Sequence, residues 1–100
     1  MLNVTVQELG DAVVLQCEGR LVRAEETNLL CAAVQHHGRE IILDLAEVTA
    51  IDAAGIGVLI SLQAAGVYVK LANPTEAVRE VLRLTNLDSI FEISEAPALA

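Results

Sequence analysis

The chain has 100 residues, enough for one domain with a single hydrophobic core. Hydrophobic residues make up 54% of it but aromatic residues only 2%, so the core must be aliphatic, which suits helices packed on a β-sheet. The formal net charge is −8, from 14 acidic and 6 basic residues. This charge repels phosphate backbones and anionic headgroups, so we expect no direct binding to nucleic acid. The acidic surface could still bind a basic protein surface. The alternative is that it is simply solvated and has no particular partner.

The first segment predicts a β-hairpin. Apolar and polar residues alternate from Val4 to Glu8 and again from Val13 to Cys17, which is typical of half-buried strands. The Gly10-Asp11 pair between them supplies a turn. Gly19 is expected to end the second strand.

A helix is predicted from Arg23 to His37, because apolar residues recur there at helical spacing and Gly38 follows as a stop. His36 and His37 fall in its last turn, where the helix dipole favours a cation. A metal site would need more ligands than this stretch supplies, so we interpret the pair as structural.

Cys17 and Cys31 stand in apolar segments, and we expect buried free thiols; a disulfide formed in an oxidising compartment is the alternative. The stretch from Met1 to Gly10 alternates and lacks the basic start of a signal peptide. No apolar stretch is long enough to cross a bilayer. We therefore expect a cytoplasmic protein without membrane insertion.

The middle of the chain predicts a strand, a helix and a second strand. Glu40–Leu45 is a nearly continuous apolar run, which is typical of a parallel strand covered on both faces. A helix is predicted from Ala53 to Ala65, and Gly66 ends it before a strand from Val67 to Ala72. One stripe of this helix is expected to contain Ile56, Leu59, Ile60 and Gln63.

A further helix is predicted to start at the NPTE run. Asn73 is expected to cap it, Pro74 suits its first position, and Glu76 completes a capping box. Its apolar face contains Val78, Val81 and Leu82, whereas Arg79 and Arg83 stand outward with Glu76 and Glu80.

The predicted order is β-β-α-β-α-β-α-β, with a short edge strand from Ser89 to Ile93 at its end. Strands separated by helices imply parallel pairing through right-handed crossovers, and the hairpin adds an antiparallel neighbour. We therefore predict an α/β fold, a mixed sheet with an N-terminal hairpin and helices packed on it. Residues 1–94 form its single domain, and residues 95–100 a flexible tail.

The residues give no sign of catalysis. Gly55 and Gly57 follow a strand and open a helix as in a dinucleotide-binding fingerprint, but Ile60 occupies the position of the third glycine. We interpret both glycines as packing positions and Asp52 as the helix cap. Asp44 lies near the end of the strand that precedes Asp52, and it could satisfy backbone groups or a neighbouring loop. The residues supply no convergent set of reactive groups. We expect no enzyme, no cofactor and no metal.

The run GREIILDLAEVTAIDAAGIG, from Gly38 to Gly57, resembles the STAS domain family, which includes the anti-anti-sigma factors (anti-sigma factor antagonists) of bacteria. The family's run is an apolar strand ending in Asp-Leu, followed by Val-x-x-x-Asp-Ser-Ser/Ala-Gly-hydrophobic-Gly. The segments GDAVVLQCEGRL and LANPTEAVREVLRLTNLDSIF resemble the family's second strand and its C-terminal third. In this chain the positions of the run are occupied by Asp44, Leu45, Val48, Asp52, Ala53, Ala54, Gly55, Ile56 and Gly57, with Ala53 at the position of the first serine.

The resemblance implies a STAS-type small sandwich that acts as a non-enzymatic protein-interaction module in transcription regulation. In typical members a serine immediately before the glycine is phosphorylated by the partner anti-sigma kinase, which breaks the complex. Ala54 stands at this position, which implies a switch site without its phosphate acceptor. The implied partner-binding residues are Asp52, Ala53, Ala54, Gly55 and Ile56, with a place in the core as the equal alternative for Ile56.

Two departures from the family pattern bear on the partner. Typical members often carry Asp after Gly-x-Leu, whereas Val22 follows here, and the helix after Asp52 is one or two turns shorter than usual. The implied partner is an anti-sigma factor or a serine-kinase-like protein. The alternatives are the subunits of a membrane transport complex, as in lipid-transport ATP-binding cassette systems, or a stressosome-like scaffold, with a homodimer also open.

Overall fold

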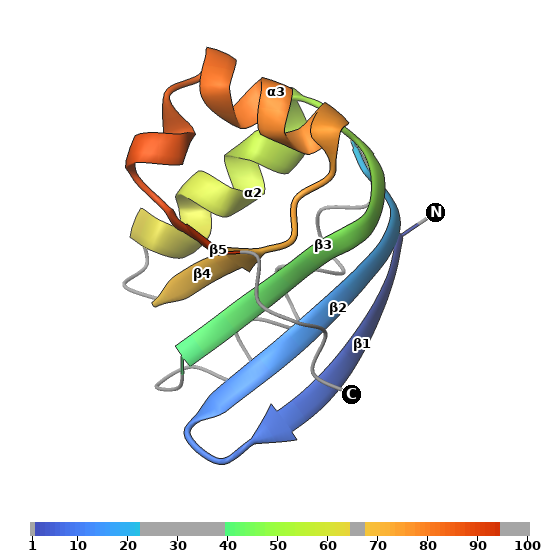
Figure 1. The fold of residues 1–100 in the computed structure, drawn as a ribbon, viewed down its shortest axis with the longest axis vertical. Helices are drawn as coiled ribbons and strands as arrows, with labels where there is room; N and C mark the ends of the chain where they lie inside the picture. Colours follow the sequence, from blue (N-terminus) through green and yellow to red (C-terminus); the bar gives the residue numbers. More distant parts are fainter. Residues whose placement is uncertain (1, 23–39, 65–67, 95–100) are drawn as a thin grey trace.

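The computed structural model describes residues 2–22, 40–64 and 68–94, which form a mixed five-stranded sheet in the order β1-β2-β3-β4-β5 with helices packed on it (Figure 1). The predicted α/β fold is confirmed. The elements are β1 (Leu2–Leu9), β2 (Ala12–Leu21), β3 (Glu40–Ile51), α2 (Ala53–Ala64), β4 (Val69–Ala72), α3 (Glu76–Leu84), the 3₁₀ turn η1 (Leu87–Ser89) and β5 (Glu92–Ser94). Outside the described residues lie the predicted helix from Arg23 to His37 with Cys31, His36 and His37, the stops Gly38 and Gly66, and the tail over 95–100.

The predicted hairpin is confirmed, and β1 pairs antiparallel with β2 from Leu2 to Leu9 without a register shift. Gly10 adopts a φ of 64°, which suits the first central position of a type II′ turn. Gly19, however, does not end β2. It adopts a φ of 115° beside a register shift against β3, and the strand continues to Leu21. Because glycine tolerates this backbone angle, it lets the strand bend and go on.

β3 is the central strand, and it pairs parallel with β2 and with β4. It is twice as long as the predicted apolar run, because pairing with β2 carries it on to Ile51. Its burial alternates, and Ile42 and Asp44 are only half-buried. The expectation that this strand is covered on both faces is therefore wrong.

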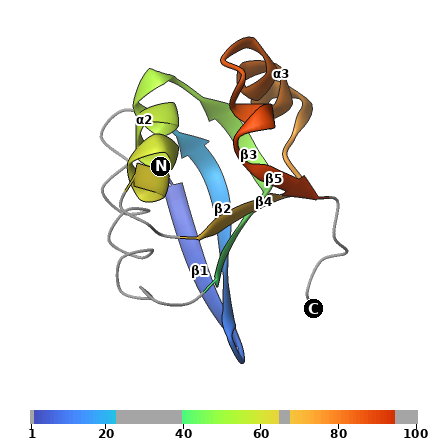
Figure 2. The same ribbon diagram turned by 90° about the vertical axis from the view of Figure 1, so that its left-hand side faces the viewer.

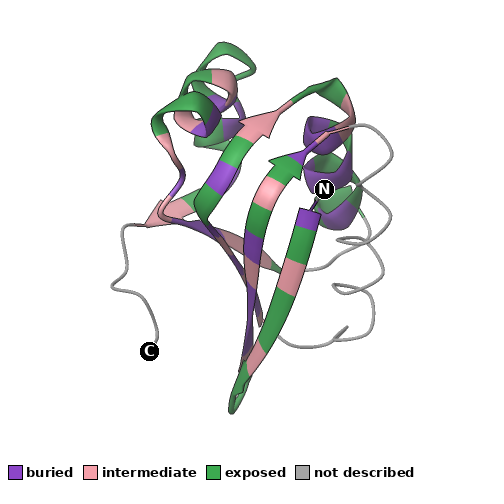
Figure 3. Ribbon diagram, turned by 90° about the vertical axis from the view of Figure 1, so that its right-hand side faces the viewer, coloured by how far each residue is buried: buried purple, intermediate pink, exposed green. Residues whose placement is uncertain are grey.

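The hydrophobic core lies on one face of the sheet (Figure 3). Side chains of α2 and α3 pack with those of the strands in a single cluster. Its fully buried members include Leu15, Leu21, Ile41, Leu43, Leu45, Leu59, Leu62, Leu71 and Val78. On the opposite face, Lys70 lies between Glu40 and Glu92, with its Nζ 3.5 Å and 3.1 Å from their carboxylate oxygens.

The start of α3 differs from the prediction. Thr75 is its N-cap, with extended backbone and with its Oγ1 accepting a hydrogen bond of 3.4 Å from the Val78 N–H. Asn73 instead adopts a left-handed φ of 53° two residues earlier. The Thr75 hydroxyl also donates to the Val48 carbonyl at 2.8 Å, a long-range contact that favours Thr75 over Asn73 as the cap.

The C-terminal strand was predicted from Ser89 to Ile93, but Ser89 ends η1 and β5 begins only at Glu92. Its edge position is confirmed within the described part of the chain, where β5 pairs with β4 alone. Figure 2 shows α3 near one end of the sheet and the β1–β2 hairpin turn at the other. Among the described residues, none of the helices has the length and apolar character needed to span a membrane.

Candidate protein-interaction site

The turn between β3 and α2 is capped as predicted. Asp52 Oδ1 accepts hydrogen bonds from the Ala54 N–H at 2.9 Å and from the Gly55 N–H at 3.1 Å. These are two of the donors that a helix start leaves without partners within the helix. The positive end of the α2 dipole therefore already faces a carboxylate of the protein itself.

Gly55 and Ile56 belong to the packing of α2 against the sheet. A Cβ on Gly55 would lie 2.4 Å from the Leu21 carbonyl oxygen and 2.7 Å from Cγ1 of Ile51. Only glycine fits this contact, so the packing interpretation of Gly55 is confirmed. Ile56 is 9% exposed and belongs to the core cluster, which decides the alternative left open for it in favour of the core.

Gly57 has a different environment. It is exposed, and a Cβ built on it would meet no atom of the described residues within 4 Å, apart from the adjacent backbone of α2 itself. The interpretation of this second glycine as a packing position is therefore wrong. Glycine within a helix costs about 1 kcal/mol relative to alanine, and the packing around Gly57 gives no reason for this cost.

The outer surface of α2 is uncharged. The helix contains no acidic or basic residue, and its buried residues are Gly55, Ile56, Val58, Leu59 and Leu62. Ile60 and Gln63, predicted on the stripe with Ile56 and Leu59, are exposed instead, Ile60 to 48%. A helix that is apolar all round is normally buried on all sides. Exposed apolar side chains that form a patch mark interaction surfaces, and Ile60 is the large apolar side chain that α2 exposes.

Two threonines tie neighbouring segments to the turn. The Thr49 hydroxyl, near the end of β3, donates to the Gly19 carbonyl at 3.2 Å. The Thr75 hydroxyl joins the start of α3 to β3. The structure thus holds Asp52, Ala53 and Ala54 at the surface, where Asp52 and Ala53 are exposed and Ala54 is half-buried.

Cys17 lies apart from this turn. It is 2% exposed, and burial, together with the nearby charge of Asp44, raises the pKa of its thiol from 9.0 to about 12. The thiol therefore stays protonated at neutral pH and packs as a small apolar group. The prediction of a buried free thiol is confirmed for Cys17.

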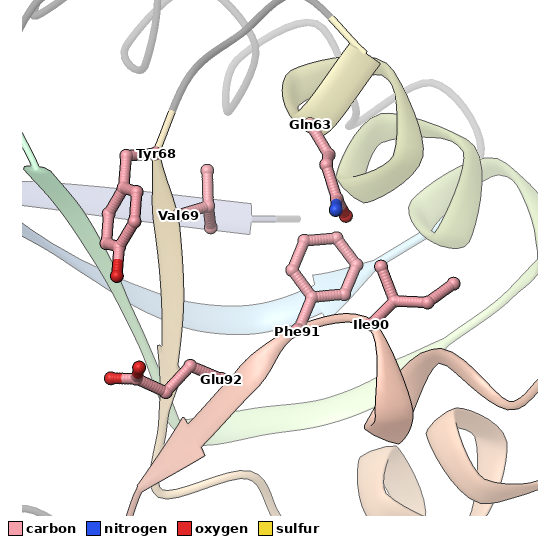
Figure 4. A pocket seen from close by; sticks show the side chains of 6 residues that line it. All are labelled: Gln63, Tyr68, Val69, Ile90, Phe91 and Glu92. Atoms are coloured by element: carbon pink, nitrogen blue, oxygen red, sulfur yellow. The ribbon is translucent and has the colours of Figure 1, made fainter.

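A surface hollow of about 300 Å³ lies between the end of α2 and the β4–β5 edge (Figure 4). Its lining consists of Gln63, Tyr68, Val69, Ile90, Phe91 and Glu92. The only carboxylate among them, Glu92, is paired with Lys70. The described residues hold no group of three side chains that could bind a metal ion. The turn and the outer face of α2 remain the stronger candidate site.

Comparison with known proteins assigns the fold to a family. The model of the family described as "Mlab, STAS domain" matches residues 4–93. A Thermotoga maritima protein assigned as an anti-sigma factor antagonist is 40% identical over 58 residues, which cover 54% of this chain and 51% of that protein. The match thus spans about half the length of this relative.

Two solved structures share the fold. The crystal structure of a Thermotoga maritima protein assigned as an anti-sigma factor antagonist aligns with a TM-score of 0.80 and 27% identity, covering 93% of this chain and 86% of that one. The Bacillus cell fate determinant SpoIIAA, in its phosphorylated form, aligns with a TM-score of 0.68 over 94% of this chain and 92% of its own. At 18% identity, this second likeness shows the fold alone. Because the family match extends over residues 4–93, the chain belongs to the STAS domain family.

Proposed function

We propose that the chain is a non-enzymatic regulator of the anti-sigma factor antagonist type. Its partner binds a surface formed by Asp52, Ala53, Ala54 and Gly57, which we call the turn surface. The partner is an anti-sigma factor or a related serine-kinase-like protein. The similarity to proteins assigned as anti-sigma factor antagonists supports the class of partner, and the geometry of α2 supports the surface.

Gly57 carries the argument for the turn surface. It is exposed on a regular helix, and the space where its Cβ would lie is open. The missing side chain lets the backbone of another molecule approach α2 closely. Ala53, one helical turn earlier, is small and exposed as well, so the two positions form a shallow uncharged path across the helix start.

The same surface lacks a phosphate acceptor. The resemblance places the phosphorylated serine at Ala54, which has no hydroxyl, and the Thr49 hydroxyl donates to the Gly19 carbonyl. The Bacillus relative SpoIIAA has a phosphorylated form. We infer that this chain stays permanently competent to bind, so that its abundance or its partner sets the amount of complex.

Two substitutions test the turn surface. Ala54→Glu adds bulk and a negative charge beside Asp52, and Gly57→Leu fills the open space with a branched side chain. Ala77→Leu is a matched control, because Ala77 is exposed in the first turn of the other helix, α3. Each tagged variant is expressed in the native cell, and the co-purified proteins are identified and quantified by mass spectrometry.

We expect the wild type and Ala77→Leu to retain one partner of the anti-sigma factor or kinase-like class, and both turn-surface variants to lose most of it. Equal retention by Ala54→Glu and Gly57→Leu would show that the partner binds elsewhere. Recovery of a permease and an ATPase, or of a large homologous scaffold, would replace the proposed class of partner.

A further inference from the structure

The first strand, β1, forms one edge of the sheet and lacks the usual features that prevent pairing with another strand. Among the described strands, β1 pairs with β2 alone, and it lies at the margin of the sheet in Figures 1 and 3. Its eight residues, LNVTVQEL, include no Pro, Gly or Lys and only one charge, on Glu8. Its register with β2 has no bulge. Lys, Pro and bulges are common means by which natural edge strands block pairing with another chain, and β1 has none of the three.

The backbone of β1 presents alternate residues to its outer side. Leu9 and Ala12 flank the two-residue turn, and such a pair exchanges hydrogen bonds within the hairpin. Antiparallel pairing alternates from there, so the N–H and C=O groups of Val4 and Val6 point away from β2. The Val6 side chain is 43% exposed on the face that carries the core, and Leu9 is 40% exposed on the other face.

This edge is complementary to itself. An antiparallel copy related by a two-fold axis at Val6 places Val6 opposite Val6 and Thr5 opposite Gln7. An axis one residue earlier places Val4 opposite Val6 and Thr5 opposite Thr5. Both arrangements keep the core faces of the two sheets on the same side. Both also keep Glu8 away from its counterpart, because Glu8 then faces Val4 or Leu2, so no like charges meet directly.

We propose that two copies of the chain associate through β1 into one continuous ten-stranded sheet, with β1 antiparallel to β1 across a two-fold axis. The contact consists of backbone hydrogen bonds and of the valine pairs of Val4 and Val6. It is small compared with a stable dimer interface, so the association is weak and reversible. It uses an edge strand rather than the turn surface, and its test is independent of the partner proposed above.

The charge of the chain gives this association a specific dependence on salt. Each copy carries a formal net charge of −8, and two copies therefore repel each other over a distance. Salt screens this repulsion, while the strand contact itself contains no ion pair. The dimer is therefore expected to tighten as salt is added, the opposite of what an interface held by ion pairs shows.

Sedimentation velocity of the full chain, up to millimolar concentration and from about 0.05 M to about 0.5 M sodium chloride, tests the proposal. Val6→Pro removes an outward N–H, which an exposed edge of the monomer tolerates. Val6→Lys places a charge at the centre of the contact, and it decides the test if Val6→Pro fails to fold by circular dichroism. Leu84→Lys is the control, because Leu84 is 73% exposed on α3.

We expect wild type and Leu84→Lys to dimerise, more tightly at high salt, and the folded Val6 variants to dimerise about tenfold more weakly or not at all. A wild type that stays monomeric at millimolar concentration in high salt would overturn the proposal. So would dimerisation that is unchanged in the folded Val6 variants, or that only Leu84→Lys abolishes.

Discussion

Gly55 and Gly57 stand two residues apart in α2 and meet opposite surroundings. Gly55 lies against the Leu21 carbonyl and the Ile51 side chain, whereas Gly57 faces open space. The sequence alone treats them alike, because each occupies a glycine position of the same motif. The two glycines differ because α2 turns Gly55 toward the sheet and Gly57 away from it, and this orientation is known only from the structure.

Alanine at each glycine separates the two roles. Gly55→Ala forces a Cβ into backbone that cannot move freely, and we expect it to lower the free energy of unfolding by about 1–3 kcal/mol. Gly57→Ala adds a methyl group that meets no other part of the described chain. It also raises helix propensity, so we expect a gain of up to about 1 kcal/mol. Urea denaturation followed by circular dichroism measures both, and a loss of stability in Gly57→Ala would show that its surroundings are not open.

The buried thiol of Cys17 predicts a pH dependence of stability. Its pKa is raised from 9.0 to about 12 in the folded chain, so the stability that it contributes is fully present below pH 9.0. That contribution is lost as pH rises toward 12, because only the unfolded chain releases the proton at these pH values. We expect Cys17 to lower the free energy of unfolding by about 1.4 kcal/mol for each pH unit above 9.0.

Urea denaturation between pH 8 and pH 10.5 (about the range over which this thiol differs between the two states) measures the slope. Cys17→Val keeps an apolar side chain and cannot ionise, so its slope should be shallower than that of wild type. Equal slopes for the two proteins would contradict the role assigned to burial.

At the scale of elements, the caps of α2 and α3 decide where each helix begins. Asp52 caps α2 with two hydrogen bonds. Thr75 caps α3 and also donates a hydrogen bond to the Val48 carbonyl in β3. The local sequence predicts Asn73 as the cap, but Asn73 adopts a left-handed backbone conformation instead. The hydrogen bond from Thr75 to Val48 joins residues 27 positions apart, so a local sequence pattern cannot predict it.

The two candidate caps of α3 are distinguished by mutation. Thr75→Ala removes the bond to Val78 and the bond to Val48, and we expect it to cost about 1–2 kcal/mol of unfolding free energy. Asn73→Gly relieves a positive φ, so it should be neutral or slightly stabilising. Thermal denaturation of both variants checks the pair, and a larger loss in Asn73→Gly would restore Asn73 as the cap.

Much of the sheet could be predicted from alternation, because strands with one buried face repeat every two residues. The two strands of the hairpin follow this rule. The central strand was predicted from its nearly continuous apolar run instead, and this run did not show that only one face of the strand is buried. The signals that failed were local ones. Gly19 predicts the end of β2 in the local sequence, but β2 stays paired with β3 as far as Leu21. The same pairing extends β3 beyond its apolar run to Ile51. The capping of α2 by Asp52 was predictable because the two N–H groups that its side chain caps, those of Ala54 and Gly55, lie within three residues of it.

At the scale of the molecule, we expect the complex to be independent of phosphorylation. Ala54 offers no oxygen to a kinase, so intact-mass spectrometry after incubation with the cognate kinase and ATP should show no phosphate on the wild type. Ala54→Ser should accept a phosphate only if the kinase still docks despite Val22. A phosphate mapped to Thr49 or Ser61 of the wild type would contradict the permanently competent state.

The central claim is that a partner approaches the α2 backbone closely at Gly57, and the affinity of Gly57→Ala for the purified partner tests it most directly. One methyl group is added at a position where the chain itself has room. We expect isothermal titration calorimetry to show binding weakened by about tenfold or more, which is about 1.4 kcal/mol, in a variant that is at least as stable as wild type. An unchanged affinity in this stable variant would show that the partner does not contact Gly57 and that the turn surface is not the interface.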